Sequence, residues 1–287
     1  MVTEINDLVA DARRRFRAAG IPPDEAALDA RLLAQHLLGW DAARLLTHGD
    51  EAATSGFHDG YERLVARRAG REPLAYITGC REFWNLNIEV TPAVLIPRPE
   101  TELLIEAALE QFARTQSIRI LDVCTGSGCV AVGLGREFPH ATIEATDISE
   151  EALAVARRNV ARHGLTTRIH CTNADLFAGI EGPFDLIVSN PPYVPTIDAK
   201  SLQPEVREFE PPAALFAGED GMRIVRRLTK EAGAFLAPDG IMIFEFGAGQ
   251  EPAIGSALAH SSCWTLLELK RDLQDIPRAA VIQKRVL

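Results

Sequence analysis

One tetrapeptide in the middle of the chain, Asn190-Pro191-Pro192-Tyr193, has an unusual capacity to accept hydrogen bonds. Neither proline carries a backbone N–H, so the local carbonyl groups meet few competing donors, and the Asn190 side chain adds a further carbonyl oxygen. Tyr193 adds a flat aromatic face. Two acceptors around one NH2 group would hold its N–H bonds and direct the nitrogen lone pair outward. This arrangement favours electrophilic attack on a delocalised nitrogen, such as methyl transfer to an amide or an aromatic amine.

The residues before the tetrapeptide predict where it lies. Residues 184–189 form a short apolar run that is typical of a buried strand in a parallel sheet. Ligands of such sheets bind just beyond the carboxyl ends of the strands. We therefore expect the tetrapeptide at an active site, although a plain proline-rich turn after a strand would have the same sequence pattern.

A second group of residues predicts a pocket for a nucleotide-like ligand. Cys124-Thr125-Gly126-Ser127-Gly128 follows the first expected strand of the sheet, where small residues let the backbone approach a ligand. Asp147 ends the next strand, where a carboxylate can accept both ribose hydroxyls. Asp175 ends a third, where it could accept an amino hydrogen of adenine, with Leu176 against the ring. No Walker lysine follows the glycines, which disfavours phosphate binding. NAD would leave the tetrapeptide without a role, whereas an adenosine-bearing methyl donor uses both groups of residues.

Hydrophobic periodicity divides the chain into a helical part and an alternating part. Apolar residues at helical spacing predict four helices in the first 75 or so residues, and alternation over residues 83–90 predicts a strand of a small hairpin. Strands and helices alternate from residue 118 onward, which predicts an α/β fold with a doubly wound, mostly parallel sheet. The expected strands are 118–123, 142–146, 168–171, 184–189, 241–246, 264–269 and 279–286, the expected helices are 129–137, 150–163, 222–236 and 251–260, and a long loop is expected over about 194–220.

Composition limits the classes of function. The chain has 287 residues, a net charge of −10 and five scattered cysteines without a CxxC pair. An acidic chain lacks the basic footprint of a nucleic-acid binder, so we expect no direct nucleic-acid partner. Neither a signal peptide nor an apolar run of the ~20 residues that span a membrane is evident. The cysteines suggest reduced thiols in the cytoplasm, and neither they nor the histidines show metal-ligand spacing.

Further motifs extend the pattern to a family resemblance. The donor pocket and Asn-Pro-Pro-Tyr resemble class I methyltransferases that use S-adenosyl-L-methionine. Residues 73–79 (Pro-Leu-Ala-Tyr-Ile-Thr-Gly), 81–84 (Arg-Glu-Phe-Trp) and 95–102 (Leu-Ile-Pro-Arg-Pro-Glu-Thr-Glu) are similar to the HemK family, the glutamine methyltransferases of peptide chain release factors.

This resemblance implies an N-terminal helical substrate-docking domain over residues 1–75, a β-hairpin linker over 76–97 and a methyltransferase domain over 98–287. It implies S-adenosyl-L-methionine as cofactor and the glutamine of a Gly-Gly-Gln loop of a release factor as substrate. The predicted donor-binding residues are Cys124, Thr125, Gly126, Ser127, Gly128, Asp147, Asp175, Leu176 and Asn190. The predicted catalytic and substrate-binding residues are Asn190, Pro191, Pro192 and Tyr193, with no metal.

Two positions depart from the family pattern, and three other functions fit part of it. Cys124 stands where the family usually has glycine, and we expect its Cβ to be tolerated if the local φ is negative. Leu176 stands where the family often has an aromatic residue. The alternatives are a ribosomal-protein glutamine methyltransferase, a DNA adenine methyltransferase, for which the acidic charge is unfavourable, and an inactive homologue that only binds release factors.

Overall fold

A computed structural model of the protein describes residues 3–259 and 263–285, and it divides into two compact units. The first, here called the helical unit, comprises the residues up to Gly79 together with Gln203–Phe209. The second, here called the sheet unit, comprises Cys80–Leu202 and the residues from Glu210 onward. The sequence did not predict that a short segment from the second half of the chain belongs to the first unit.

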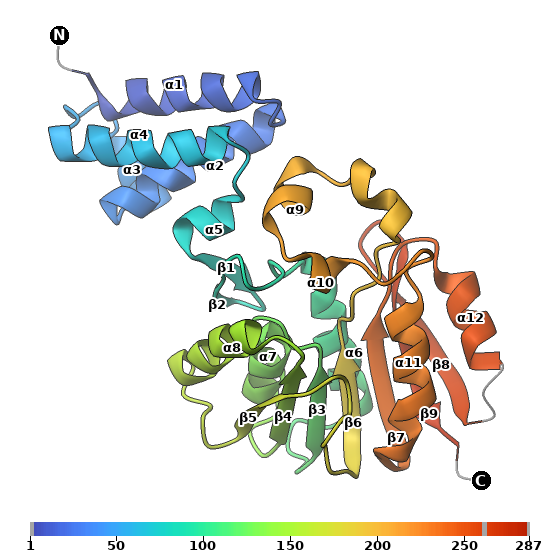
Figure 1. Ribbon diagram of the computed structural model, residues 1–287. Coiled ribbons are helices and arrows are strands. Elements are labelled where there is room, and N and C mark those ends of the chain that lie inside the picture. Colours follow the sequence, from blue (N-terminus) through green and yellow to red (C-terminus); the bar gives the residue numbers. More distant parts are fainter. Residues whose placement is uncertain (1–2, 260–262, 286–287) are drawn as a thin grey trace. The chain divides into compact units, whose positions relative to one another are not determined.

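The helical unit consists of short helices around a small apolar core (Figure 1). Phe16, Leu33 and Tyr61 are buried in this core. The Asp41 side chain caps its third helix by accepting a hydrogen bond from the Arg44 N–H at 2.7 Å. Its helices are α1 (Ile5–Ala18), α2 (Pro23–Leu38), α3 (Ala42–His48), α4 (Ser55–Ala69), α5 (Leu74–Thr78) and α9 (Pro204–Phe209).

A buried network of charges holds α9 in the helical unit. The Arg68 side chain is only 1% exposed and donates hydrogen bonds to Asp29 at 2.7 Å, Glu25 at 2.8 Å and Glu205 at 2.9 Å. Arg71 donates to the second oxygen of Glu205 at 2.6 Å. Glu205 is the residue of α9 in this network. Burial alone would raise the pKa of its carboxyl group, but the hydrogen bonds from Arg71 and Arg68 hold that pKa below its usual value.

The sheet unit begins with a two-stranded hairpin, β1 (Cys80–Phe83) and β2 (Leu86–Glu89). Trp84 and Asn85 form its turn with φ values of 52° and 55°. Two residues at positive φ give the turn a twist that matches the two strands. The strand predicted over residues 83–90 was therefore wrong at its start, because Phe83 ends β1 and the alternating apolar residues begin on a turn that Asn85 tolerates.

Seven strands form the main sheet in the order β5-β4-β3-β6-β7-β9-β8 (Figure 1). The first five of these are parallel, and β9 lies antiparallel between β7 and β8. The predicted α/β fold with a doubly wound, mostly parallel sheet is confirmed. The strands are β3 (Arg119–Val123), β4 (Thr142–Asp147), β5 (Ile169–Asn173), β6 (Phe184–Ser189), β7 (Leu236–Glu245), β8 (Trp264–Arg271) and β9 (Pro277–Lys284).

Helices cover both faces of this sheet. Helices α6 (Glu102–Gln111), α7 (Cys129–Glu137) and α8 (Glu150–Arg162) pack next to one another in that order. Helices α11 (Arg223–Glu231) and α12 (Glu251–Ala259) share a second core with the sheet, since apolar residues of both helices belong to the same buried cluster as Leu121, Ile187 and Phe244. Since Leu121 and its neighbour Ile120 point to opposite faces of a strand, the sheet is buried on both sides.

Two further predicted elements differ from the structure. The helix expected over 222–236 ends at Glu231, and a 3-10 turn at Ala232–Ala234 leads directly into β7. The loop expected over 194–220 contains short helical segments, namely a 3-10 helix at Thr196–Ser201, α9, and α10 (Pro212–Leu215). Residue 260 of the expected last helix and residue 286 of the expected last strand lie outside the described residues.

The register of the parallel strands determines what meets at their carboxyl ends. Val123 pairs with Thr146 on one side and with Ser189 on the other, and Ser189 pairs with Phe244. The residues that follow or end these strands therefore lie in one row along the same edge of the sheet. In the order of the strands, that row is Asp147, Cys124, Asn190 and Glu245.

Candidate active site

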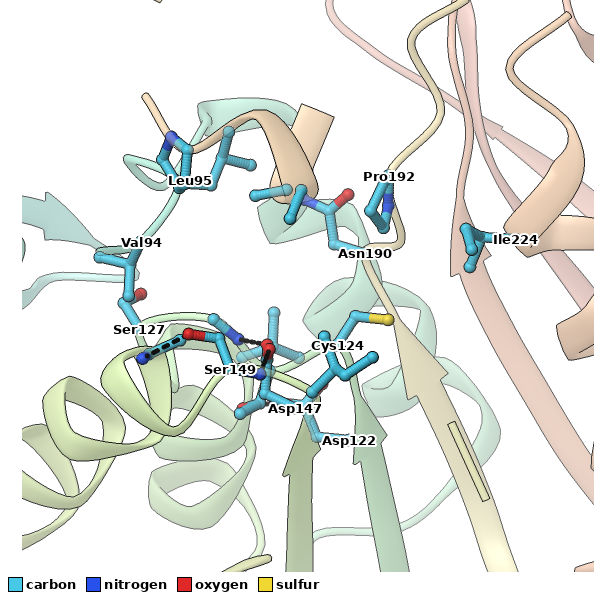
Figure 2. Close-up of a pocket in the computed structure, with 18 of the residues that line it drawn as sticks. Val94, Leu95, Asp122, Cys124, Ser127, Asp147, Ser149, Asn190, Pro192 and Ile224 are labelled. Carbon is cyan, nitrogen blue, oxygen red and sulfur yellow. Dashed lines mark hydrogen bonds between the residues drawn. The ribbon is translucent and has the colours of Figure 1, made fainter. Parts of the chain in front are cut away.

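A cavity of about 390 Å³ opens at this edge and is lined only by residues of the sheet unit. Its size lies in the range typical of small-molecule sites. Figure 2 shows Asn190 and Pro192 on one side of it, and Cys124, Asp147 and Ser149 on another. The predicted residues that line the cavity are Cys124, Thr125, Gly126, Ser127, Asp147, Asp175, Leu176, Asn190 and Pro192. Gly128, Pro191 and Tyr193 are not among the described residues that line it.

The two glycines of the turn after β3 have different roles. Gly126 has φ +55°, and a Cβ atom built there would meet nothing within 4 Å, so its backbone faces open space in which a ligand can approach. Gly128 has φ +78°, and a Cβ atom there would lie 3.1 Å from the Cβ atom of Ala156 on α8. Gly128 therefore permits close packing of the turn against α8, and its predicted part in donor binding is indirect.

Asp147 anchors the turn from the neighbouring strand. One carboxylate oxygen accepts from the Gly126 N–H at 2.9 Å and the other from the Ser149 N–H at 2.9 Å (Figure 2). Burial raises the pKa of Asp147, and these backbone N–H groups oppose that rise. A carboxylate has about four acceptor positions, so two remain for hydroxyl groups of a ligand. Its role in binding a ribose stays a prediction.

A second carboxylate, Asp122, supports the turn from below. It is 1% exposed, accepts from the Thr125 hydroxyl at 2.6 Å and from the Ala131 N–H at 3.2 Å, and also lines the cavity. Burial raises the pKa of Asp122 to about 7, against the effect of these two donors. Sequence reasoning did not include Asp122 among the site residues, because an acidic residue inside an apolar strand gave no sign of its contacts with the turn.

Cys124 lies in a backbone conformation that favours glycine. Its φ is +61°, so the condition of a negative φ, under which the cysteine was expected to be tolerated, is not met. A residue with a Cβ atom in this region costs roughly 1–2 kcal/mol. The side chain packs at the border of the core between the sheet and α11. Burial and the charge of Asp147 raise the pKa of the thiol well above its usual range, so it remains protonated.

Asp175 and Leu176 form another part of the lining. Asp175 lies two residues beyond β5, which ends at Asn173, so it follows the strand and does not end it as predicted. The Arg227 guanidinium donates to both of its oxygens, at 2.9 and 3.2 Å, which fixes the carboxylate at the mouth of the cavity. Leu176, with φ +57° and 5% exposure, contributes an apolar wall.

The Asn190 amide is held in one orientation. Its Nδ2 atom donates to the Thr101 hydroxyl at 3.0 Å, whereas its Oδ1 atom is buried and has no hydrogen-bond partner among the described residues. A buried carbonyl oxygen without a donor costs roughly 1–3 kcal/mol. Such an oxygen next to a cavity points to a ligand that supplies the missing N–H (Figure 2).

Tyr193 is held behind the cavity wall by two contacts. Its hydroxyl donates to Glu245 Oε1 at 2.9 Å, and its backbone carbonyl accepts from Gln250 Nε2 at 2.9 Å. Burial and the negative charge of Glu245 raise the pKa of the phenol, which therefore remains a hydrogen-bond donor. These contacts fix the conformation of the tetrapeptide, in which Pro191 is buried and Pro192 faces the cavity.

Sequence reasoning missed several residues of the site. Thr101 was noted only as part of a family motif, and its spacing gave no indication that it would contact Asn190. Arg227 comes from α11, a helix that the sequence predicted without assigning any of its residues to the site. Residues from α10 and its flanks, Pro211, Ala213, Ala214 and Phe216, complete the lining from the segment that was expected to be a loop.

Two family models match successive parts of the chain. Residues 7–79 match the PrmC N-terminal domain, and residues 99–204 match the methyltransferase small domain. A release factor glutamine methyltransferase of Deinococcus radiodurans is 41% identical over 255 residues, which cover 89% of this chain and 90% of that protein. A protein of the same name from Koribacter versatilis is 41% identical over 275 residues, covering 95% of this chain and 96% of that protein.

Solved structures share the fold at low sequence identity. A ribosomal protein L11 methylase from Lactobacillus delbrueckii subsp. bulgaricus is 24% identical, with a TM-score of 0.51 over 69% of this chain and 86% of that chain. The catalytic domain of hMettl16, in complex with an RNA hairpin, is 17% identical, with a TM-score of 0.54 over 77% of this chain and 80% of that chain. Among the described residues, no helix is long and apolar enough to cross a membrane.

Proposed function

Because the chain belongs to the family of release factor glutamine methyltransferases, we propose that it methylates the side-chain amide of a glutamine in peptide chain release factors. The methyl donor is S-adenosyl-L-methionine, and the glutamine is that of the Gly-Gly-Gln motif. The single observation that carries the proposal is the buried Asn190 Oδ1 atom, which has no hydrogen-bond donor among the described residues and belongs to a residue that lines the cavity. A glutamine side chain supplies an NH2 group of the kind that this atom lacks.

The residues of the cavity fit S-adenosyl-L-methionine. The open space at Gly126 receives the ligand close to the backbone, and Asp147 has acceptor positions left for ribose hydroxyls. Asp175 and Leu176 are placed for the adenine, the first as an acceptor of its amino group and the second as an apolar wall. Bound there, S-adenosyl-L-methionine supplies an electrophilic methyl group.

The chain's contribution to the chemistry is to hold and orient the acceptor amide. Asn190 Oδ1 accepts one hydrogen of the glutamine NH2, and the Pro191 carbonyl is the predicted acceptor of the other, although Pro191 is buried and not among the described residues that line the cavity. With both N–H bonds held, the nitrogen lone pair is directed toward the methyl group, and delocalisation into the amide carbonyl weakens. Alignment of the reacting atoms supplies most of the rate. The proton leaves after the new N–C bond forms, so no strong base is required.

The helical unit is proposed to bind the release factor, and the sheet unit to perform the transfer. Among its described residues, the helical unit holds no group of acid–base or ligand-binding side chains, whereas the described residues that line the cavity all belong to the sheet unit. Docking away from the reacting amide would supply binding energy that is used to place the glutamine loop. We also propose that the protein acts in the cytosol, on protein and without direct contact to nucleic acid.

The experiment compares three acceptors under one set of conditions. Purified release factor, ribosomal protein and adenine-containing DNA are each incubated with the protein and labelled S-adenosyl-L-methionine. The proposal predicts label only in the release factor, and no label in a release factor whose Gly-Gly-Gln glutamine is replaced by glutamate. Label in either of the other acceptors, or in the glutamate variant, would contradict it.

A further inference from the structure

The buried carboxylate of Glu245 has no part in the mechanism described so far. It ends β7, the strand next to β6, and it is 2% exposed. Since Ser189 pairs with Phe244, Glu245 stands level with Asn190 at the carboxyl edge of the sheet. It does not line the cavity among the described residues, so it does not contact the ligands directly.

Two hydroxyl groups interact with this carboxylate, those of Tyr193 and Thr101. The Tyr193 hydroxyl donates to Glu245 Oε1 at 2.9 Å, and Glu245 Oε2 has no hydrogen-bond partner among the described residues. The Thr101 hydroxyl lowers the pKa of the same carboxylate and so stabilises its anionic form. Thr101 is 1% exposed, and its oxygen accepts from Asn190 Nδ2 at 3.0 Å. A line of polar groups therefore runs from Glu245 through Thr101 to Asn190.

The direction of the hydrogen bonds along this line follows from what each group can do. An ionised carboxylate only accepts, so a hydroxyl that faces it directs its single proton toward it. The Thr101 oxygen then has only lone pairs to offer on its other side. Of the two ends of the Asn190 amide, only the NH2 can pair with them. The carbonyl oxygen is thereby turned the other way, and it is the atom that has no hydrogen-bond partner in the described part of the chain.

We propose that Glu245 is a positioning residue, which acts through Thr101 to fix the orientation of the Asn190 amide so that Oδ1 receives the NH2 of the acceptor. This inference rests on the proposed function, because it concerns the amide that the site is proposed to hold. Without this constraint the Asn190 amide could rotate and present its own NH2, which would repel the NH2 of the substrate.

The charges around Glu245 make this device sensitive to pH. Burial raises the pKa of Glu245 to about 7, while the hydroxyls of Thr101 and Tyr193 oppose the rise. Glu100 raises it further and Arg278 lowers it. As pH falls through this value, the carboxylate gains a proton that it can donate to Thr101. The hydroxyl can then reverse and donate to Asn190 Oδ1, so turnover should fall on the acidic side.

The test uses the full chain, intact release factor and three variants. Thr101→Val keeps the shape of the side chain and removes the hydroxyl, whereas Thr101→Ser keeps the hydroxyl. Glu245→Gln keeps the shape and removes the titration. Thr172→Val is the matched control, because Thr172 donates to Glu144 at 3.2 Å elsewhere on the same sheet. For each protein the donor Kd, the kcat and the dependence of kcat on pH are measured.

We expect Thr101→Val and Glu245→Gln to lose roughly ten- to a hundredfold in kcat, on the scale seen when the partner behind a functional ligand is removed. The donor Kd should stay unchanged, Thr101→Ser should keep most of the turnover, and Thr172→Val should match the wild type. The decline of kcat below pH 7 should disappear in Glu245→Gln. In an Asn190→Ala background, Thr101→Val should cost nothing further, since Thr101 acts only through Asn190.

The opposite results overturn the inference. Wild-type kcat in Thr101→Val, or an additive loss in the double variant, would show that Thr101 does not act through Asn190. A persistent acidic decline in Glu245→Gln would remove Glu245 from the line. If Glu245→Gln fails to fold, as judged by its donor Kd, the two Thr101 variants decide the question alone. If the wild type itself does not methylate release factor, the proposed function fails and this inference falls with it.

Discussion

The role of Asp147 can be tested by removing its carboxylate. In Asp147→Ala, the N–H groups of Gly126 and Ser149 lose their acceptor, which each of them now reaches at 2.9 Å. The donor also loses the carboxylate proposed to bind its ribose. One hydrogen bond to a charged group contributes roughly 1.5–3 kcal/mol. At about 1.4 kcal/mol per factor of ten, the Kd of S-adenosyl-L-methionine should rise roughly 10- to 150-fold.

A matched variant separates this effect from a general loss of stability. Asp185→Ala also removes a carboxylate that accepts a backbone N–H, that of Arg119 at 2.8 Å. Asp185 lies near the start of β6, at the opposite edge of the sheet from the cavity. Calorimetry should therefore find the wild-type donor Kd in Asp185→Ala. An unchanged Kd in Asp147→Ala, or an equal loss in both variants, would refute the placement of the ribose at Asp147.

Three further predictions concern other parts of the chain. Asn190→Ala should lower kcat on the order of 10²–10³-fold, as when one positioned hydrogen-bond partner of a reacting group is removed, with little change in the donor Kd; steady-state kinetics and calorimetry check this. Cys124→Gly should bind the donor more tightly than Cys124→Ala, because only glycine relieves the cost of φ +61°, and equal Kd values would contradict it. Glu205→Ala should destabilise the helical unit by less than the roughly 3–5 kcal/mol of a broken buried pair, because Arg68 keeps Asp29. Since the pKa of Glu205 is lowered, its contribution is present at neutral pH and lost as pH falls through that lowered pKa, which chemical denaturation at several pH values would detect.

Much of the sheet unit could be predicted from the sequence, for a physical reason. A buried parallel strand such as residues 184–189 must be mostly apolar, and a helix such as Glu150–Arg162 must keep one apolar side, so both patterns are visible in one sequence. The turns that follow these parallel strands lie at one edge of the sheet, so the predicted ligand-binding residues in them are brought together there. The row formed by Asp147, Cys124 and Asn190 follows from that topology alone.

The parts that could not be predicted depend on contacts between distant segments. Nothing near Glu205 in the sequence indicates that Arg68 and Arg71 bind it, so the membership of α9 in the helical unit was invisible. The contact of Thr101 with Asn190 joins residues that are 89 positions apart. The φ of Cys124 could not be read from its neighbours, because a cysteine in a left-handed conformation contradicts the local preference that prediction uses.

The ion pairs of Arg68 and Arg71 with Glu205 affect how the proposed docking role of the helical unit should be tested. A fragment that begins near Leu74 would lack Arg68 and Arg71, and so leave Glu205 without its partners. A comparison of substrates avoids this problem, since it keeps the chain whole. If the helical unit binds the release factor, kcat/KM should be much higher for the intact factor than for a short peptide that contains Gly-Gly-Gln. Equal values would make the helical unit a stabilising element only.

The most direct test of the central claim locates the transferred methyl group in the product. Release factor that has been incubated with the protein and isotopically labelled S-adenosyl-L-methionine is digested, and its peptides are sequenced by tandem mass spectrometry. The structure predicts one labelled methyl group, on the side-chain nitrogen of the Gly-Gly-Gln glutamine, and its loss when Asn190→Ala replaces the wild type. A methyl group on any other residue, or the same yield from Asn190→Ala, would contradict the account.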